Sequence, residues 1–337
     1  MRDSEPPATI PARRDETVPG AGRRRPRRRP RTVDVPLGDA LDTLPTEDEQ
    51  EAGHRLAHVG GPGELSAAIL AMLLPSGSKR ALTAWRLETA GTATAEALRE
   101  TVSALSGAAR LPWFERLLGR MALQPGDART ALAQAARRLM GARGVARPID
   151  RLHWLALRRG LGETAPLAAR PHPVGGSDGP GGEMWLESDV LAVAAVTAFL
   201  SRLVPHAGAE AGADAAPHAD DPRGDGERWY DAVMTGWPST ATLDIPPCRP
   251  PPAEAMIEAL HRLQTLSWMQ RPQVLRAWLD AALLHGANDR LRTRAPRLDD
   301  DAADALAMVC GLLDTPLPAA LGRHYVTLPA DVPVRTP

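Results

Sequence analysis

Apolar residues recur at intervals of three and four along nearly the whole chain after about residue 60. That spacing places them on one side of an α-helix, which must be buried against other helices. Representative stripes are Phe114-Leu117-Leu118-Met121, Leu275-Trp278-Leu279-Ala282 and Leu306-Val309-Cys310-Leu313. The alternation with period two that indicates a strand is confined to two short segments, 241–245 and 325–328. We therefore predict an all-α fold, a helical bundle of about ten helices.

The residues that begin these stripes support the predicted helix positions. Pro112 and Pro148 are expected in first turns, where a missing N–H leaves no hydrogen bond unmade. The run Asp299-Asp300-Asp301 is expected to cap a helix and to meet the positive end of its dipole. The predicted helices cover residues 64–74, 79–88, 93–106, 111–122, 127–141, 148–161, 187–204, 227–236, 253–268, 271–285 and 300–314.

Composition divides the chain into helical units and connecting segments. An apolar content of 43% is sufficient for a core, which excludes a wholly disordered chain. Two internal stretches are rich in glycine, proline, alanine or aspartate, as loops and linkers are. We predict a disordered Arg/Pro-rich tail at 1–52, a first helical subdomain at 53–165, a Gly/Pro linker at 166–186, a second helical subdomain at 187–324 with a loop at 206–226, and a C-terminal tail at 325–337.

The N-terminal tail differs in charge from the rest of the chain. Residues 1–36 contain ten arginines and five acidic residues, although the whole chain has a formal charge of only −1. Repulsion between the arginines and the fixed φ of the prolines both oppose a helix there. Either the tail is a solvated linker, or its arginines bind nucleic acid or another anionic surface. The arginines of this possible anion-binding tail are Arg23, Arg24, Arg25, Arg27, Arg28, Arg29 and Arg31.

Cysteine usage and hydropathy indicate a compartment. The two cysteines, Cys248 and Cys310, cannot form a disulfide framework, and the sequence shows no secretory leader. No apolar run reaches the length of roughly 18 to 20 residues that a membrane-spanning helix needs. We therefore expect a cytoplasmic protein without a membrane span.

The sequence contains no complete catalytic pattern. The segment His54-Arg55-Leu56-Ala57-His58 has the histidine spacing of a zincin, but Arg55 occupies the position where such an enzyme needs a glutamate. The glycines that follow argue against a helix presenting both histidines. We expect no zinc, no other metal, no cofactor and no enzymatic activity.

Several large side chains have a structural interpretation. Trp113, Trp154, Trp268 and Trp278 all fall inside predicted helices, where tryptophan is first of all a core or groove residue. Trp278 is expected to pack against the helix that carries Leu306.

Two segments share one plan, an apolar helix, a glycine-containing turn and a second apolar helix. They cover 128–161, with the turn Gly141-Ala142-Arg143-Gly144, and 274–313, with the turn Gly286-Ala287-Asn288-Asp289. The first copy of this degenerate helix-turn-helix repeat, at residues 136–152, resembles the tellurite-resistance TerB-like pattern, in which an Ala-Asp-Gly turn precedes an acidic residue that opens the next helix. Arg143 replaces the acidic turn residue of that pattern. The resemblance therefore leaves Asp150 and Asp289 as possible repeat-turn acids, and we expect no metal between them.

The same region resembles part of a larger family. Leu313-Asp314-Thr315-Pro316-Leu317-Pro318 is similar to the Leu-Asp-x-Pro-x-Pro ending of the C-terminal helical region of some bacterial membrane zinc metallopeptidases of the Ste-type and heat-shock-type group. Val59-Gly60-Gly61-Pro62 is similar to the segment that opens that region. The resemblance covers about residues 58–324, without the family's peptidase domain, membrane helices or His-Glu-x-x-His helix. It implies a stand-alone helical module, a partner or remnant of such a peptidase.

These observations favour a non-enzymatic helical protein-interaction or regulatory module. One alternative is a detached accessory module that docks on a membrane zinc metallopeptidase. A further alternative is binding to nucleic acid or an anionic surface through the arginine tail.

Overall fold

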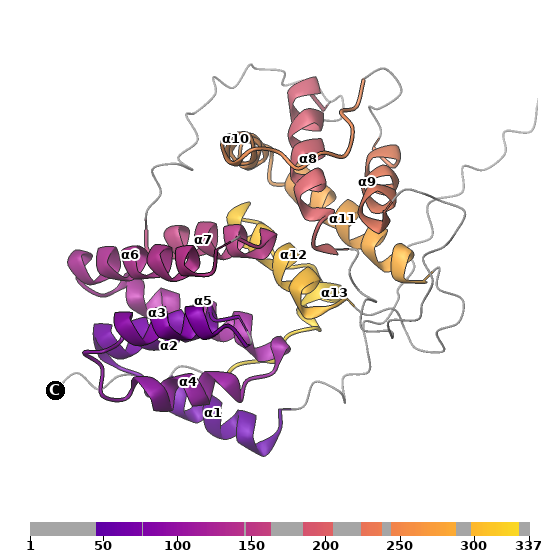
Figure 1. Ribbon diagram of the computed structural model, residues 1–337. Helices are drawn as coiled ribbons and strands as arrows, with labels where there is room; N and C mark the ends of the chain where they lie inside the picture. Colours follow the sequence, from indigo (N-terminus) through magenta and orange to yellow (C-terminus); the bar gives the residue numbers. More distant parts are fainter. Residues whose placement is uncertain are drawn as a thin grey trace, which may run out of the picture. The chain divides into compact units, whose positions relative to one another are not determined.

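The computed structural model describes residues 45–75, 77–144, 146–162, 185–204, 224–237, 244–287 and 298–329, without the side chains of 285–287. Within these ranges the fold is all-helical and contains no strand. The helices, labelled in Figure 1, are α1 (Glu47–Ala57), α2 (Gly61–Met72), α3 (Lys79–Glu88), α4 (Ala95–Ser103), α5 (Gly107–Ala122), α6 (Gly126–Ala142), α7 (Pro148–Gly160), α8 (Glu187–Leu200), α9 (Asp225–Thr235), α10 (Ala253–Gln264), α11 (Gln270–Ala287), α12 (Asp300–Leu312) and α13 (Ala319–Gly322).

The predicted all-α class is confirmed, and two elements extend it. Helix α1 lies partly inside the predicted disordered tail, so the end of that tail at residue 52 is wrong. Its N-cap Thr46 accepts a hydrogen bond from Glu49 N–H, and Ala52 and Leu56 are buried. The sequence pattern missed α1 because its buried side, Glu49, Ala52, Gly53 and Leu56, contains one large apolar residue and so shows no apolar stripe. Helix α13 is a single short turn, too brief to show a periodic pattern.

Helix α2 organises the N-terminal helices. It packs against α3, α4, α5 and α6, and it is apolar around most of its surface. Trp85 of α3 is fully buried, and its indole N–H donates to the carbonyl oxygen of Ala67 in α2 at 3.2 Å. This bond satisfies the one polar atom of a large core side chain.

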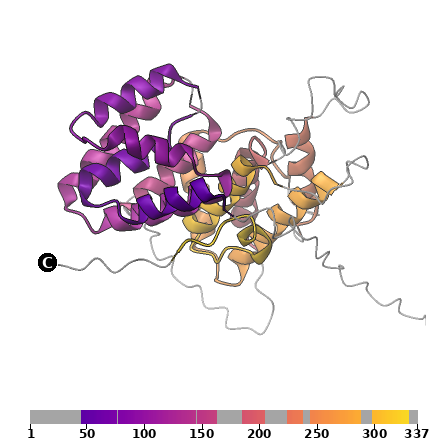
Figure 2. The ribbon, with the colours of Figure 1, turned by 90° about the horizontal axis from the view of Figure 1, so that it is seen from below.

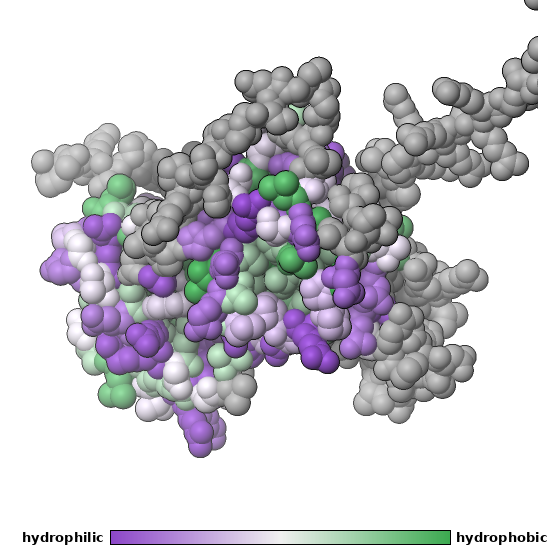
Figure 3. Space-filling model, turned by 90° about the horizontal axis from the view of Figure 1, so that it is seen from above, coloured by the Kyte–Doolittle hydropathy of each residue, from purple (hydrophilic) through white to green (hydrophobic). Residues whose placement is uncertain are grey.

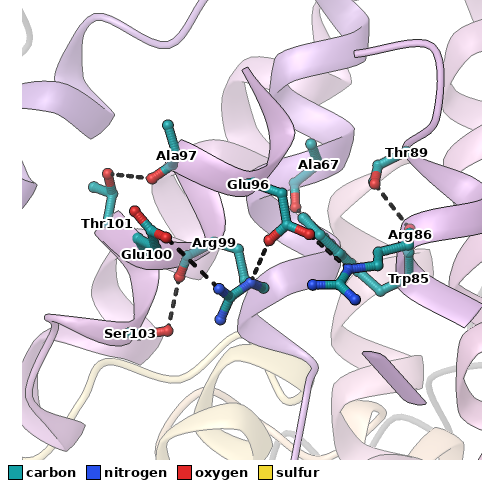
Figure 4. Close-up of polar contacts among 10 residues, drawn as sticks. All are labelled: Ala67, Trp85, Arg86, Thr89, Glu96, Ala97, Arg99, Glu100, Thr101 and Ser103. Atoms are coloured by element: carbon teal, nitrogen blue, oxygen red, sulfur yellow. Dashed lines mark hydrogen bonds and ion pairs between the residues drawn. The ribbon is translucent and has the colours of Figure 1, made fainter. Parts of the chain in front are cut away.

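A polar cluster joins α3 to α4 at the surface (Figure 4). Glu96 accepts from Arg86 Nε at 2.6 Å and from Arg99 Nε at 2.8 Å, so one carboxylate bridges two helices. At the end of α3, Thr89 Oγ1 donates to the carbonyl oxygen of Trp85 at 2.9 Å. These bonds fix the turn between α3 and α4.

Helix α8 organises the C-terminal helices by packing against α9 and α10. The Asp189 carboxylate accepts a hydrogen bond from Leu186 N–H at the start of α8 and another from Arg262 Nε of α10 at 2.6 Å. Trp278 of α11 is fully buried as predicted, and its indole N–H donates to Thr197 Oγ1 of α8 at 2.8 Å. Trp268 is different: α10 ends at Gln264, so Trp268 lies in the following turn and is 76% exposed, contrary to the prediction.

Helix α12 lies between the two groups of helices in both ribbon views (Figures 1 and 2). It packs against α5 and α7 on one side and against α11 on the other. Residues 302–310 are all buried, so the helix has no solvent-facing side along that stretch. The second predicted subdomain, 187–324, therefore contributes a helix to the core of the first.

Both ends of α12 have hydrogen-bond partners, and those at its end come from neighbouring helices. Asp299 caps its start by accepting from Asp301 N–H at 2.6 Å, which agrees with the expected role of the aspartate run. At its end, the carbonyl oxygen of Leu312 accepts from Gln264 of α10 at 2.6 Å and from Arg159 of α7 at 3.4 Å. Polar and cationic donors at a helix C-terminus satisfy carbonyls that have no partner within the helix.

Pro112 lies inside α5, not in its first turn as predicted. Proline has no N–H, so it leaves the carbonyl of Ala108, four residues earlier, without its helical donor. Val326 N–H donates to that carbonyl oxygen at 3.2 Å. The start of the predicted C-terminal tail thus packs on α5, and Tyr325 Oη donates to Asp304 of α12 at 3.0 Å.

None of the described helices combines the length and the apolar character that crossing a membrane requires.

Replacing Trp278 by alanine tests the core assignment. We expect a loss of about 3 to 5 kcal/mol in the free energy of unfolding, because a large buried side chain is deleted. The matched control is Trp268→Ala, which removes an exposed indole and should cost under about 1 kcal/mol. Urea melts measure both, and equal midpoint shifts in the two variants would contradict the assignment.

Candidate binding groove

The candidate site is an open groove between the helix pair α6–α7 and helix α10. It encloses about 750 Å³. Its lining comes from one side of each helix, because the contributing residues recur at intervals of three and four. The lining residues are Thr130, Ala133, Gln134, Arg137 and Met140 of α6, Ala146 of the turn, Asp150, Arg151, Trp154, Leu155 and Arg158 of α7, and Ala253, Met256 and Ile257 of α10.

A buried ion pair positions α7 against α6. Asp150 is 4% exposed, and its carboxylate accepts from the Arg147 N–H at 3.0 Å and from Arg143 Nη1 at 2.7 Å. Gly144 has φ +88°, the left-handed conformation that glycine adopts readily, and so lets the turn close. Burial lowers the pKa of the Arg143 guanidinium, and the neighbouring Asp150 carboxylate opposes that effect.

This geometry gives the predicted turn acids different outcomes. Asp150 opens α7, as the repeat pattern expects, but its carboxylate is occupied by donors from Arg143 and Arg147. Asp289 lies outside the described residues, as do the seven arginines of the possible anion-binding tail.

The floor of the groove is apolar. Leu155 and Met256 are buried, whereas Met140, Trp154 and Ile257 are only half-buried although they pack against the main core. Half-buried apolar side chains along a hollow keep water-exposed apolar area that a bound molecule would cover.

The α6–α7 wall of the groove is basic. Arg137 and Arg151 are exposed, and the guanidinium of Arg158 lies over the Trp154 ring at 5.9 Å from its centroid. Asp150 is the one acidic residue of the lining, and its charge is balanced by Arg143 and Arg147. The groove therefore carries a net positive charge. Figure 3 views the molecule from above the orientation of Figure 1, that is, from the end where α8 and α10 lie. This face shows recessed hydrophobic surface bordered by hydrophilic residues.

From the sequence, Trp154 was expected to be a core or groove residue and Asp150 a possible repeat-turn acid, whereas the other members of this site were missed. A local signal was present: Arg151 and Arg158 stand three residues before and four residues after Trp154, so the three share one side of a helix. The contribution of Met256 and Ile257 has no such signal, because it depends on where α10 packs.

A second cluster lies between α5, α12 and the segment after α13. Burial raises the pKa of Asp304 to about 7, and the hydrogen bond from Tyr325 opposes that shift. Burial also raises the pKa of Glu115 above its ordinary value. Glu115, Cys310 and Tyr325 line a small hollow of about 230 Å³, but Asp304 does not reach it. Asp304 and Cys310 are buried, Tyr325 is half-buried and Glu115 keeps exposed surface, and the hollow offers little room for a ligand.

The two cysteines have environments that favour the neutral thiol. Burial raises the pKa of Cys310 to about 12, and burial also raises that of Cys248, whose Sγ lies 3.3 Å from Ser201 Oγ.

The histidine pair of the zincin-like segment lies at the end of a helix that the sequence analysis did not expect. His54 belongs to α1, and His58 follows as its C-cap, with Nδ1 2.7 Å from the carbonyl oxygen of His54. Both side chains are exposed. The described part of the chain contains no group of three or more histidine, cysteine, aspartate or glutamate side chains arranged to hold a metal ion.

No protein-family model matches the chain, and no curated protein or solved structure matches it either.

The pKa of Asp304 generates a pH-dependent prediction. The unfolded chain ionises Asp304 near pH 4, whereas the folded chain keeps it protonated up to about pH 7. The folded state therefore loses stability as the pH rises between these values. The side chain of Asp304→Asn cannot ionise. The free energy of unfolding of this variant, relative to that of the original chain, should therefore be about 2 to 3 kcal/mol higher at pH 8 than at pH 5.

Urea melts at the two pH values measure this gain. Glu254→Gln, which changes an exposed carboxylate on α10, serves as the control and should show a much smaller change. If the difference in free energy of unfolding between Asp304→Asn and the original chain is the same at both pH values, Asp304 is not held protonated.

Proposed function

We propose that this protein is a non-enzymatic helical interaction module that binds a partner protein in the groove between α6, α7 and α10. The observation that carries the proposal is the combination of a half-exposed apolar floor with Arg137, Arg151 and Arg158 around it. The proposal includes a cytoplasmic location, where Cys248 and Cys310 would remain reduced.

The residue types support a protein partner. Tryptophan and arginine are the residues most enriched among those that contribute strongly to protein–protein binding, and here Trp154 and Arg158 are stacked together. Met140 and Met256 add flexible apolar side chains that adapt to a partner's surface.

The rigid positions of these side chains also support binding. Arg143 and Asp150 fix the α6–α7 turn. Helix α10 packs on α8, and its Arg262 donates a hydrogen bond to Asp189 of α8. A groove formed by anchored helices loses little conformational freedom when it binds.

Site-specific photo-cross-linking tests the proposal. A photoreactive amino acid is placed at Ile257 or Gln134 in the groove, and at Leu87 or Leu123 as controls that are 75% and 86% exposed elsewhere. Both groove positions should give the same discrete adduct in the source cells, and neither control position should give it. An adduct from all four positions, or from none, would contradict the groove as the docking site.

Trp154→Ala then measures the contribution of the aromatic floor. The partner is identified by the cross-link and purified separately. We expect its dissociation constant to rise at least about 10-fold in this variant, because a central aromatic contact is lost. Arg137→Ala, at an exposed position, should weaken binding without altering the melt. Unchanged affinity in both variants would rule out the groove.

The identity of the cross-linked protein also separates the accessory hypothesis from the general one. A membrane zinc metallopeptidase in the adduct would support the role of an accessory module, whereas any other protein would argue against it.

A further inference from the structure

The groove has the features of a site for a helix with one acidic edge, and we propose that its occupant is an acidic amphipathic helix of the partner. This inference rests on the proposed function and specifies the chemistry of the partner. It is drawn from the length of the groove, from its apolar floor and from the unequal charge of its two walls.

The length of the groove fits about two to three helical turns. Its lining extends from Thr130 to Met140 on α6 and from Asp150 to Arg158 on α7. At a rise of 1.5 Å per residue these stretches span about 15 Å and about 12 Å. A helix of similar length presents apolar side chains at positions i, i+4 and i+7, the usual anchors of a helix bound in a groove.

The apolar floor determines which side of the occupant faces inward. Met140, Trp154 and Ile257 are half-buried, come from three different helices and line the same hollow. Aliphatic or aromatic residues of an amphipathic helix would complete the burial of these three side chains.

The two walls of the groove differ in charge. The α6–α7 wall presents Arg137, Arg151 and Arg158. The α10 lining, Ala253, Met256 and Ile257, carries no charge, and its exposed neighbours in sequence, Glu254 and Glu258, are acidic. The preference for acidic residues should therefore apply to the edge of the occupant that faces α6 and α7, and not to its other edge.

A charge-reversal selection tests this inference. The probe is a displayed library of 16-residue helices with a fixed apolar side, in which each position on the two edges is either glutamate or lysine. Selection is carried out on the full-length protein and on Arg137→Glu/Arg151→Glu. The control for total charge is Arg80→Glu/Arg323→Glu, which changes two exposed arginines that do not line the groove.

The expected result is an enrichment of glutamate over lysine of at least about 10-fold on one edge, for the original protein and for the control variant. The groove variant should enrich lysine on that same edge. Equal enrichment on both edges, identical selection by all three proteins, or no enrichment would overturn the acidic helix. Preferential binding of a fatty acid such as oleate, with no selected helix, would identify the occupant as an anionic amphiphile instead.

The two proposals fail in different ways. If the groove positions cross-link a protein but the library shows no glutamate preference, the interaction module stands and the acidic helix is wrong. If neither groove position gives an adduct and Trp154→Ala leaves binding unchanged, the docking site itself is wrong.

Discussion

The burial of α12 on all sides is the constraint on which the rest of the structure depends. A helix with no solvent-facing side must be surrounded, and here the surrounding helices come from both halves of the sequence. Donors from α7 and α10 satisfy the carbonyl of Leu312, so packing and hydrogen bonding act at the same place. Because α7 packs on α12 and also lines the groove, the position of the candidate site follows from the burial of α12.

Most helices could be predicted from the sequence because their apolar stripes are long and regular. Helix α3 matches its predicted range, 79–88, and its N-cap Ser78 accepts from Ala81 N–H. The errors arose where local rules compete with tertiary contacts. Pro112 normally indicates a first turn, but in this fold another segment supplies a donor to the carbonyl that proline leaves unpaired. Trp268 was assigned to the preceding helix, but that helix ends at Gln264, so Trp268 stands exposed in the turn before α11.

The candidate site was harder to predict than the fold. Periodicity shows that Trp154 lies on an apolar side of its helix, but it does not show whether that side is fully covered. Coverage depends on α10, which is almost 100 residues away in the sequence. Asp304 presents the same difficulty, since one acidic residue within an apolar stripe resembles a solvent-facing position until the partner Tyr325 is known. Burial and charge at such positions follow from long-range packing.

The contact between Val326 and the carbonyl of Ala108 has a consequence for synthesis of the chain on the ribosome. The acceptor emerges more than 200 residues before its donor, and α12, which covers α5 and α7, also emerges late. Until then the nascent N-terminal helices display apolar surface that their own half of the sequence does not cover. Chaperones that bind apolar surface on growing chains would therefore bind α1–α7. A chain truncated before α12 would leave that surface permanently uncovered.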